Sequence, residues 1–146
     1  MAFHTTQRIE VRLDATLLRS ILRDLSEFQP LVSIIDVVRP ESDAVWSVDL
    51  RADLGPIRRS KRLRMARVSA DDEGTLVFER QELDNRRHAS WRLTIEIQPV
   101  ANGSAVEIIL DYDGRVPLGV LEGLVAEEIV AASQRLESII DERGAR

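Results

Sequence analysis

The sequence contains no cysteine, only two histidines and no long apolar run. Without cysteine the chain has no disulfide framework, no thiolate nucleophile and no cysteine-based zinc site. His4 and His88 are far apart and neither belongs to a paired histidine motif, so we expect no metal site and no cofactor. A three-ligand metal site built largely from carboxylates stays open, because it would have no sequence signature. No apolar stretch approaches the ~18 residues of a transmembrane helix, and residues 1–4 do not begin a signal peptide. These absences favour a cytoplasmic protein without a transmembrane segment.

Motifs for catalysis are missing as well. Ser26, Ser33 and Ser90 have no nucleophile motif around them, and no glycine-rich loop could hold a phosphate. We therefore assign no catalytic residue on motif grounds.

The composition is that of one ordinary globular domain. The chain has 146 residues, of which 44% are hydrophobic and 31% charged, so neither disorder nor a fibrous class is indicated. No repeat, linker or low-complexity segment divides the sequence, and we predict a single domain over residues 1–146. The net charge of −5 argues against a protein that is basic over most of its surface.

Alternating and helical periodicities predict an α+β fold. A strand at 5–13 precedes a helix at 15–25 that Asp14 can cap, and residues 28–31 form a break or a second helical turn. A turn at 40–43 and further turn residues separate six more strands, at 33–39, 44–53, 58–69, 75–83, 88–99 and 104–113. An amphipathic helix at 117–141 closes the chain. Short connections make the six strands an antiparallel meander, which must curl around the long helix.

This order of elements resembles the START-like, Bet v 1-like superfamily, in particular its polyketide cyclase/dehydrase-type and carbon-monoxide-dehydrogenase-subunit-G-like branches. The resemblance covers nearly the whole chain and also rests on DLSEFQPL at 24–31, LGPI at 54–57 and GSAVEI at 103–108. It implies a helix-grip fold, a curved seven-stranded antiparallel sheet around a long C-terminal helix. It also implies a cavity for a lipid, sterol, polyketide, quinone or similar apolar molecule.

A basic run with six lysine or arginine side chains extends from Arg58 to Arg67. Alternation places Leu63 and Met65 on the inner face of the sheet and every second residue on the outer face. The outer row then holds Arg58, Arg62 and Arg64, and the acids that we expect opposite them on adjoining strands are Asp49, Asp53 and Glu79.

Two interpretations of this outer row stay open. It is either a charged surface that keeps the protein soluble, or a docking patch for an acidic partner or an anionic head group. A homodimer is a further possible partner. We do not expect nucleic acid as a partner, because the run has no aromatic residue on which a base could stack.

The apolar residues on the inner faces of the strands would, on their alternation alone, be assigned to an ordinary hydrophobic core. The resemblance implies that they line a ligand cavity, together with Arg80, which continues the inward register of Phe78. The residues predicted to bind the ligand are Trp46, Val48, Leu50, Leu63, Met65, Phe78, Arg80, Trp91, Leu93, Ile108, Tyr112, Leu121 and Val125.

We therefore expect a noncatalytic binding or carrier module for an apolar small molecule. A cyclase- or dehydratase-like enzyme that uses the same cavity is the first alternative, and its only candidate groups are Arg80, Glu82, Tyr112 and Glu128. A protein-interaction module that docks through the basic outer face is the second alternative. Arg80 has a structural alternative to facing the ligand. It could form an ion pair with Glu82 or Glu128, because an unpaired buried charge is too costly.

Overall fold

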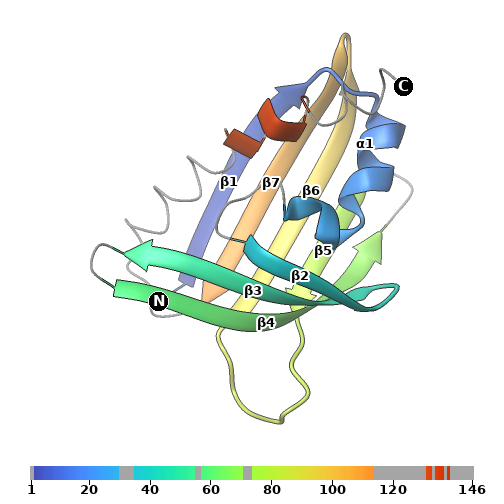
Figure 1. Ribbon diagram of the computed structural model, residues 1–146. Helices are drawn as coiled ribbons and strands as arrows, with labels where there is room; N and C mark the ends of the chain where they lie inside the picture. The colour runs from blue at the N-terminus through green and yellow to red at the C-terminus, as the bar shows by residue number, and fades with distance from the viewer. Residues whose placement is uncertain are drawn as a thin grey trace.

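A curved antiparallel sheet forms most of the structure (Figure 1). The computed structural model describes residues 2–29, 35–54, 57–70, 74–113, 131–132, 134–136 and 138. Within these ranges the sheet has seven strands in the order β1-β7-β6-β5-β4-β3-β2. The strands are β1 (Ala2–Val11), β2 (Ile35–Ser42), β3 (Val45–Leu54), β4 (Ile57–Ala70), β5 (Thr75–Arg80), β6 (Ser90–Val100) and β7 (Gly103–Asp113). β2 to β7 form the predicted meander, and β1 pairs with β7.

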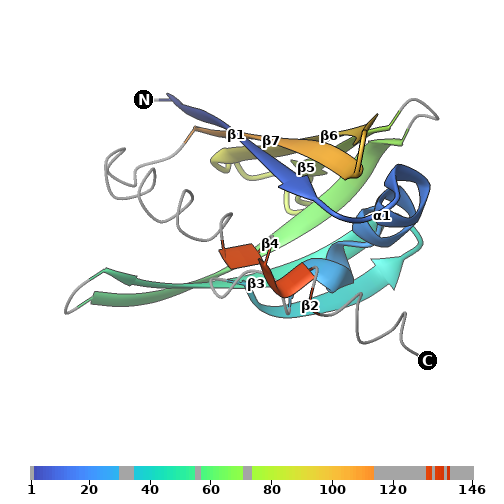
Figure 2. The ribbon, with the colours of Figure 1, turned by 90° about the horizontal axis from the view of Figure 1, so that it is seen from above.

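The sheet folds over on itself and encloses its helices. Seen from above, β1, β7 and β6 lie over β2 and β3, and the sheet turns between the two layers (Figure 2). The helix α1 (Ala15–Leu22) and the 3-10 helix η1 (Leu25–Phe28) follow β1, and α1 lies at one end inside the curve (Figure 2). The sequence predicts this curved sheet with one or two short helices after the first strand.

The first helix is shorter than predicted because Asp24 ends it. Asp14 caps its start as expected, since its carboxylate accepts the backbone N–H of Leu17 at 3.1 Å. The predicted helix at 15–25 nevertheless ends at Leu22, because Asp24 is extended and accepts the N–H of Ser26 at 2.9 Å. An Asp side chain that bonds its own backbone competes with the helix and begins a new turn.

The turn between β2 and β3 lies later than the predicted turn at 40–43. Strand β2 continues through Pro40, which pairs with Trp46, and the turn comes at Asp43 and Ala44. Pro40 is tolerated there because β2 is the edge strand of the sheet and the register is irregular beside it. Other strand ends differ from the prediction by a few residues, and β5 ends earlier, at Arg80.

Side chains alternate along the strands, and one face of the sheet carries the core. At the end covered by α1 and η1 most of the inner face is buried, because Leu18, Leu22 and Leu25 pack on it. The strand residues buried in this core are Val11, Val38, Trp46, Val48, Leu63, Met65, Leu76, Phe78, Ile95, Ile97 and Val106. The inward register that the sequence predicts for β3 to β7 is therefore correct.

The predicted helix at 117–141 is described only at its later residues. Residues 131–132, 134–136 and 138 are helical. Leu136 is buried and Ala132, one turn earlier, packs against the same core. The described part of the C-terminal segment thus contacts the concave side of the sheet. No helix in the described ranges is long and apolar enough to cross a bilayer.

Candidate functional site

The inner face has a second region, away from α1, that is built around Trp91 and Tyr112. These two residues are register partners on β6 and β7, and their ring centroids are 4.3 Å apart. Tyr112 is buried, whereas Trp91 is only partly buried. The apolar residues that pack around Tyr112 are Ile9, Ala89, Trp91, Ile108 and Leu110. We call this group the Trp91 cluster.

Burial differs between the two regions of the inner face. Phe78 and Leu76 are fully buried beside α1, and Phe78 packs against Phe28 and Trp46 at centroid distances of 6.2 and 5.8 Å. In the Trp91 cluster all the apolar side chains except Tyr112 are only partly buried. Apolar side chains therefore point inward in both regions but are completely covered only near α1.

The structure brings the predicted ligand-binding residues onto one face of the sheet. Trp46, Val48, Leu63, Met65, Phe78 and Tyr112 are buried, and Leu50, Trp91, Leu93 and Ile108 are partly buried. Leu121 and Val125 lie outside the described residues, as does Glu128. The sequence analysis missed Thr5, which is 9% exposed and shares the inward register of Val11. Extending the alternation of β1 toward its start would have found it.

The indole nitrogen of Trp91 is a buried donor for which the described part of the chain supplies no acceptor. Its Nε1 atom has no hydrogen-bond partner among the described residues. An indole N–H can only donate, and leaving a buried donor unpaired costs roughly 1–3 kcal/mol. An acceptor that reached this atom would remove the cost of the unpaired donor.

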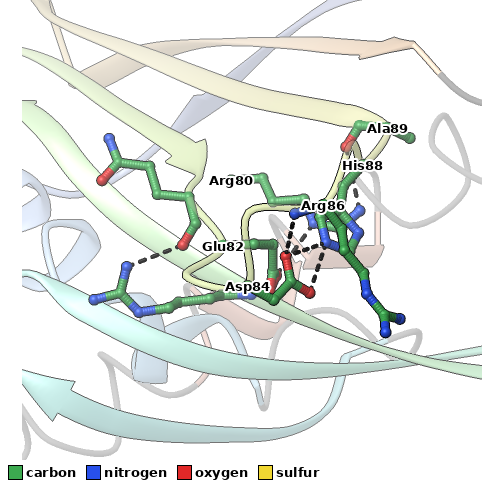
Figure 3. A network of polar contacts seen from close by, with 8 residues as sticks. Arg80, Glu82, Asp84, Arg86, His88 and Ala89 are labelled. Carbon is green, nitrogen blue, oxygen red and sulfur yellow. Dashed lines mark hydrogen bonds and ion pairs between the residues drawn. The ribbon is translucent and has the colours of Figure 1, made fainter.

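Arg80 ends in a network of protein contacts rather than in free space (Figure 3). Its side chain is only 5% exposed, and Nε donates to Glu82 Oε1 at 3.2 Å. Nη1 donates to the carbonyl oxygen of Ala89 at 3.2 Å, and Nη2 lies 3.3 Å from His88 Nδ1. Glu82 also accepts the backbone N–H of Arg64 at 2.7 Å. Each nitrogen of the Arg80 guanidinium thus has a partner within the chain.

His88 extends this network to the loop between β5 and β6. Its Nε2 lies 2.9 Å from both carboxylate oxygens of Asp84. Because Nδ1 faces an arginine N–H, the contacts fit the tautomer with its hydrogen on Nε2. The backbone N–H of Arg86 and then the His88 ring hold the pKa of Asp84 below its ordinary value. The network fixes the loop and leaves His88 hydrogen-bonded on both ring nitrogens.

Arg67 has a structural role that the sequence analysis did not assign. Its guanidinium lies 5.7 Å from the ring centroid of Trp46, and Nη1 donates to the carbonyl oxygen of Arg23 at 2.6 Å. Burial, followed by the nearby charge of Arg23, lowers the pKa of Arg67. Arg67 therefore fastens the end of α1 to β4 from the inner face.

Cross-strand ion pairs form on the described outer face. Asp49 accepts from Arg62 at 2.8 Å and from Arg39 at 3.0 Å, and these bonds hold the pKa of Asp49 below its ordinary value. Arg64 pairs with Glu41 at 3.0 Å.

Only one of the acids expected opposite the basic row takes that position among the described side chains. Asp49 pairs with Arg62, whereas Glu79 pairs with Arg92 at 3.4 Å instead of with the row. The side chains of Asp53 and Arg58 lie outside the described ones. The described part of the basic row is therefore matched by acids of the same sheet.

The described residues contain no group of three or more His, Cys, Asp or Glu side chains that could hold a metal ion. His4 contacts Asp111 through Nδ1 on the exposed face of β1 and β7, and its Nε2 lies 3.4 Å from the hydroxyl of Thr6.

Comparison of this structure with solved structures identifies the fold. A START superfamily protein from Mycobacterium smegmatis superposes with a TM-score of 0.71 at 16% identity, over 95% of this chain and 97% of that one. The Zhui aromatase/cyclase from Streptomyces sp. R1128 gives 0.69 at 14% identity, over 98% and 96%. The protein has a START/Bet v 1-like fold. Ara h 8.0201, which has the same fold, gives 0.65 at 11% identity, over 97% and 99%.

Sequence comparison adds no closer relationship to this START/Bet v 1-like fold. No protein-family model matches the chain, and no curated protein matches it. The predicted resemblance is therefore confirmed at the level of the fold, by structures that share 16% identity or less with the chain.

Proposed function

We propose that the protein binds and carries an apolar small molecule, such as a lipid, a polyketide or a quinone, between the inner face of the sheet and the C-terminal helix. The observation that carries this proposal is the incomplete burial of the inward apolar side chains in the Trp91 cluster. A ligand there would lie against Trp91, Leu93 and Ile108. Leu121 and Val125 would contribute from the C-terminal side.

The energetics of apolar burial support a ligand in this region. Removing apolar surface from water stabilises by roughly 25 cal/mol per Å². Partly buried side chains on the concave face therefore gain from an apolar molecule that covers them. The region beside α1 offers no such gain, because Phe78, Leu76 and Leu18 are already at 0% exposure.

The structural relatives agree with a ligand-binding role. They include a START superfamily protein, the Zhui aromatase/cyclase and the di-domain aromatase/cyclase StfQ from the steffimycin biosynthetic pathway. The shared fold supports a binding surface enclosed by the sheet, while the chemistry of each relative depends on its own side chains. We propose that this chain acts in the cytoplasm as a binding protein of this kind.

The described side chains give the enzyme alternative little support. Arg80 and Glu82 are bonded to each other and to main-chain atoms. A general acid or base must reach the substrate, whereas Arg80 and Glu82 direct their polar atoms to partners within the protein. The interaction alternative is weakened in the same way, because Arg62 and Arg64 pair with acids of the sheet.

Native mass spectrometry of the protein purified without denaturant tests the proposal. We expect a bound apolar molecule that organic extraction releases, and displacement of a fluorescent fatty acid by that extract. Protein that carries no extractable molecule and binds no fluorescent fatty acid would contradict the proposal.

A further inference from the structure

We infer that the ligand presents a neutral carbonyl oxygen to the Nε1–H of Trp91, so that this donor selects ketones, quinones or esters over hydrocarbons. This inference rests on the proposed function and names the chemical class of the ligand. Its starting point is the buried Nε1, which has no acceptor among the described residues.

The partner must be an acceptor, because an indole N–H donates and cannot accept. Four of the side chains in this cluster, Ile9, Ala89, Ile108 and Leu110, carry no acceptor, and the hydroxyl of Tyr112 does not bond the indole nitrogen. An apolar ligand without oxygen would cover the cluster but leave the donor unpaired. A ligand with a carbonyl at this position would satisfy it.

We infer a neutral acceptor because the neighbouring cation, the guanidinium of Arg80, already forms an ion pair with Glu82. Arg80 lies close to the cluster, since its Nη1 bonds the carbonyl oxygen of Ala89. Its charge is matched by Glu82, and its third nitrogen faces His88. A carboxylate placed beside Trp91 would lose its hydration without gaining Arg80 as a free counter-charge, because Arg80 is already paired with Glu82, and burying an uncompensated charge is costly in an apolar site. A ketone or ester carbonyl carries no such penalty.

Matched ligand pairs in which a carbonyl replaces one methylene test this inference. We suggest 9-fluorenone against fluorene, and 2-tridecanone against tridecane, each measured by displacement of a fluorescent fatty acid. The ketone should bind more tightly in each pair that binds, by roughly five- to tenfold, which is the value of one net hydrogen bond. Trp91→Phe keeps an aromatic ring but removes the N–H, so it should abolish this preference.

Thr94→Val is the matched control, because it removes a hydrogen-bond donor from the outer face of the same strand. Thr94 is the register partner of Ile109, between the inward positions of β6. The ketone preference should persist in this variant. A preference that disappears in both variants would overturn the inference.

Nuclear magnetic resonance of the unmodified protein gives a second readout that does not depend on the folding of a variant. In protein labelled with 15N-tryptophan, 2-tridecanone or 9-fluorenone should move the indole proton resonance of Trp91 downfield and slow its exchange with water. The matching hydrocarbon should do neither.

Failure of the inference can be distinguished from failure of the proposed function. Equal affinities within each pair, with no effect of Trp91→Phe, would overturn the carbonyl inference and leave the carrier function intact. Binding of the fluorescent fatty acid without any binding of either ketone would do the same. Absence of all binding, of the fatty acid included, would overturn both.

Discussion

Ser104 is a buried polar side chain that ties the start of β7 to the segment after β1. It is completely buried, and its hydroxyl donates to the carbonyl oxygen of Leu13 at 2.7 Å. Ser104→Ala should lower the free energy of unfolding by roughly 1–3 kcal/mol, because the carbonyl of Leu13 loses its partner. Urea denaturation measures this change, and Ser90→Ala, at an exposed position, should change stability by less than about 0.5 kcal/mol. Equal effects of the two substitutions would contradict the role of the hydrogen bond.

Asp49 makes part of the stability of the sheet depend on pH. Arg62, followed by Arg39, holds its folded-state pKa below the ordinary value. A carboxylate with a depressed pKa contributes stability at neutral pH, and this contribution is lost as the pH falls through the depressed pKa. Asp49→Asn should therefore lower the melting temperature at pH 7, by the equivalent of up to about 1 kcal/mol.

The same substitution should have no effect below the depressed pKa, where the aspartate is protonated in both states. Melting curves from pH 7 down to pH 2 measure the difference between the two proteins. A difference that stays constant over this range would show that Asp49 acts through packing rather than through its charge.

At the scale of elements, Gly103 sets the geometry of the connection between β6 and β7. Its φ is +152°, and a Cβ atom built there would lie 2.0 Å from the carbonyl oxygen of Val11. Gly103→Ala should therefore destabilise the protein by more than about 2 kcal/mol, because the clash is with main chain that has no rotamer to change. Thermal denaturation measures the loss. A variant with unchanged stability would mean that the end of β1 can move away from this turn.

The network around Arg80 links β4, β5 and the loop that leads to β6. Arg80→Met should remove the contacts to Glu82, Ala89 and His88. The free energy of unfolding should fall by about 2–4 kcal/mol, since a partly buried Glu82 loses its counter-charge. Arg92→Met, at an exposed pair, should cost less than about 1 kcal/mol. If Arg80→Met kept its stability and lost ligand binding, Arg80 would be a ligand contact instead.

The sequence predicted the strands because most of them alternate between core-facing apolar and outward polar side chains. Alternation identified the inward positions of β3 to β7 correctly, and it placed Leu63 and Met65 on the core side of a run otherwise rich in arginine. The ends of elements were less predictable. Asp24 ended α1 through a local hydrogen bond, and Pro40 stayed within a strand because β2 lies at the sheet edge. Both outcomes depend on backbone neighbours that periodicity does not specify.

The site was predictable as a face but not as a set of contacts. The inward register of Arg80 was visible in the sequence, whereas the carbonyl of Ala89 and the ring of His88 reach it only after the loop folds back. Arg64 pairs with Glu41, which was not among the acids expected opposite the basic row, and Glu79, which was, lies beside Arg92 on the next strand. Alternation fixes which side a residue occupies, and strand order decides its partner.

At the scale of the whole molecule, the two halves of the concave face differ in how far their inward apolar side chains are buried. The helix α1 completes the half around Phe78, where exposure falls to 0%. In the half around Trp91 and Tyr112 most inward apolar side chains remain partly buried, and one buried donor lacks an acceptor among the described residues. The proposed carrier function assigns an apolar ligand to the second half.

Contact quenching of Trp91 by a brominated lipid tests this account most directly. The chain has two tryptophans, so Trp46→Phe leaves Trp91 as the sole emitter and Trp91→Phe leaves Trp46. The methyl ester of dibromostearic acid should quench Trp91 strongly and saturably, because bromine must touch the ring. It should quench Trp46 far less, because Trp46 is packed between Phe78 and Arg67 at 3% exposure. The absence of saturable quenching of Trp91 would contradict the account.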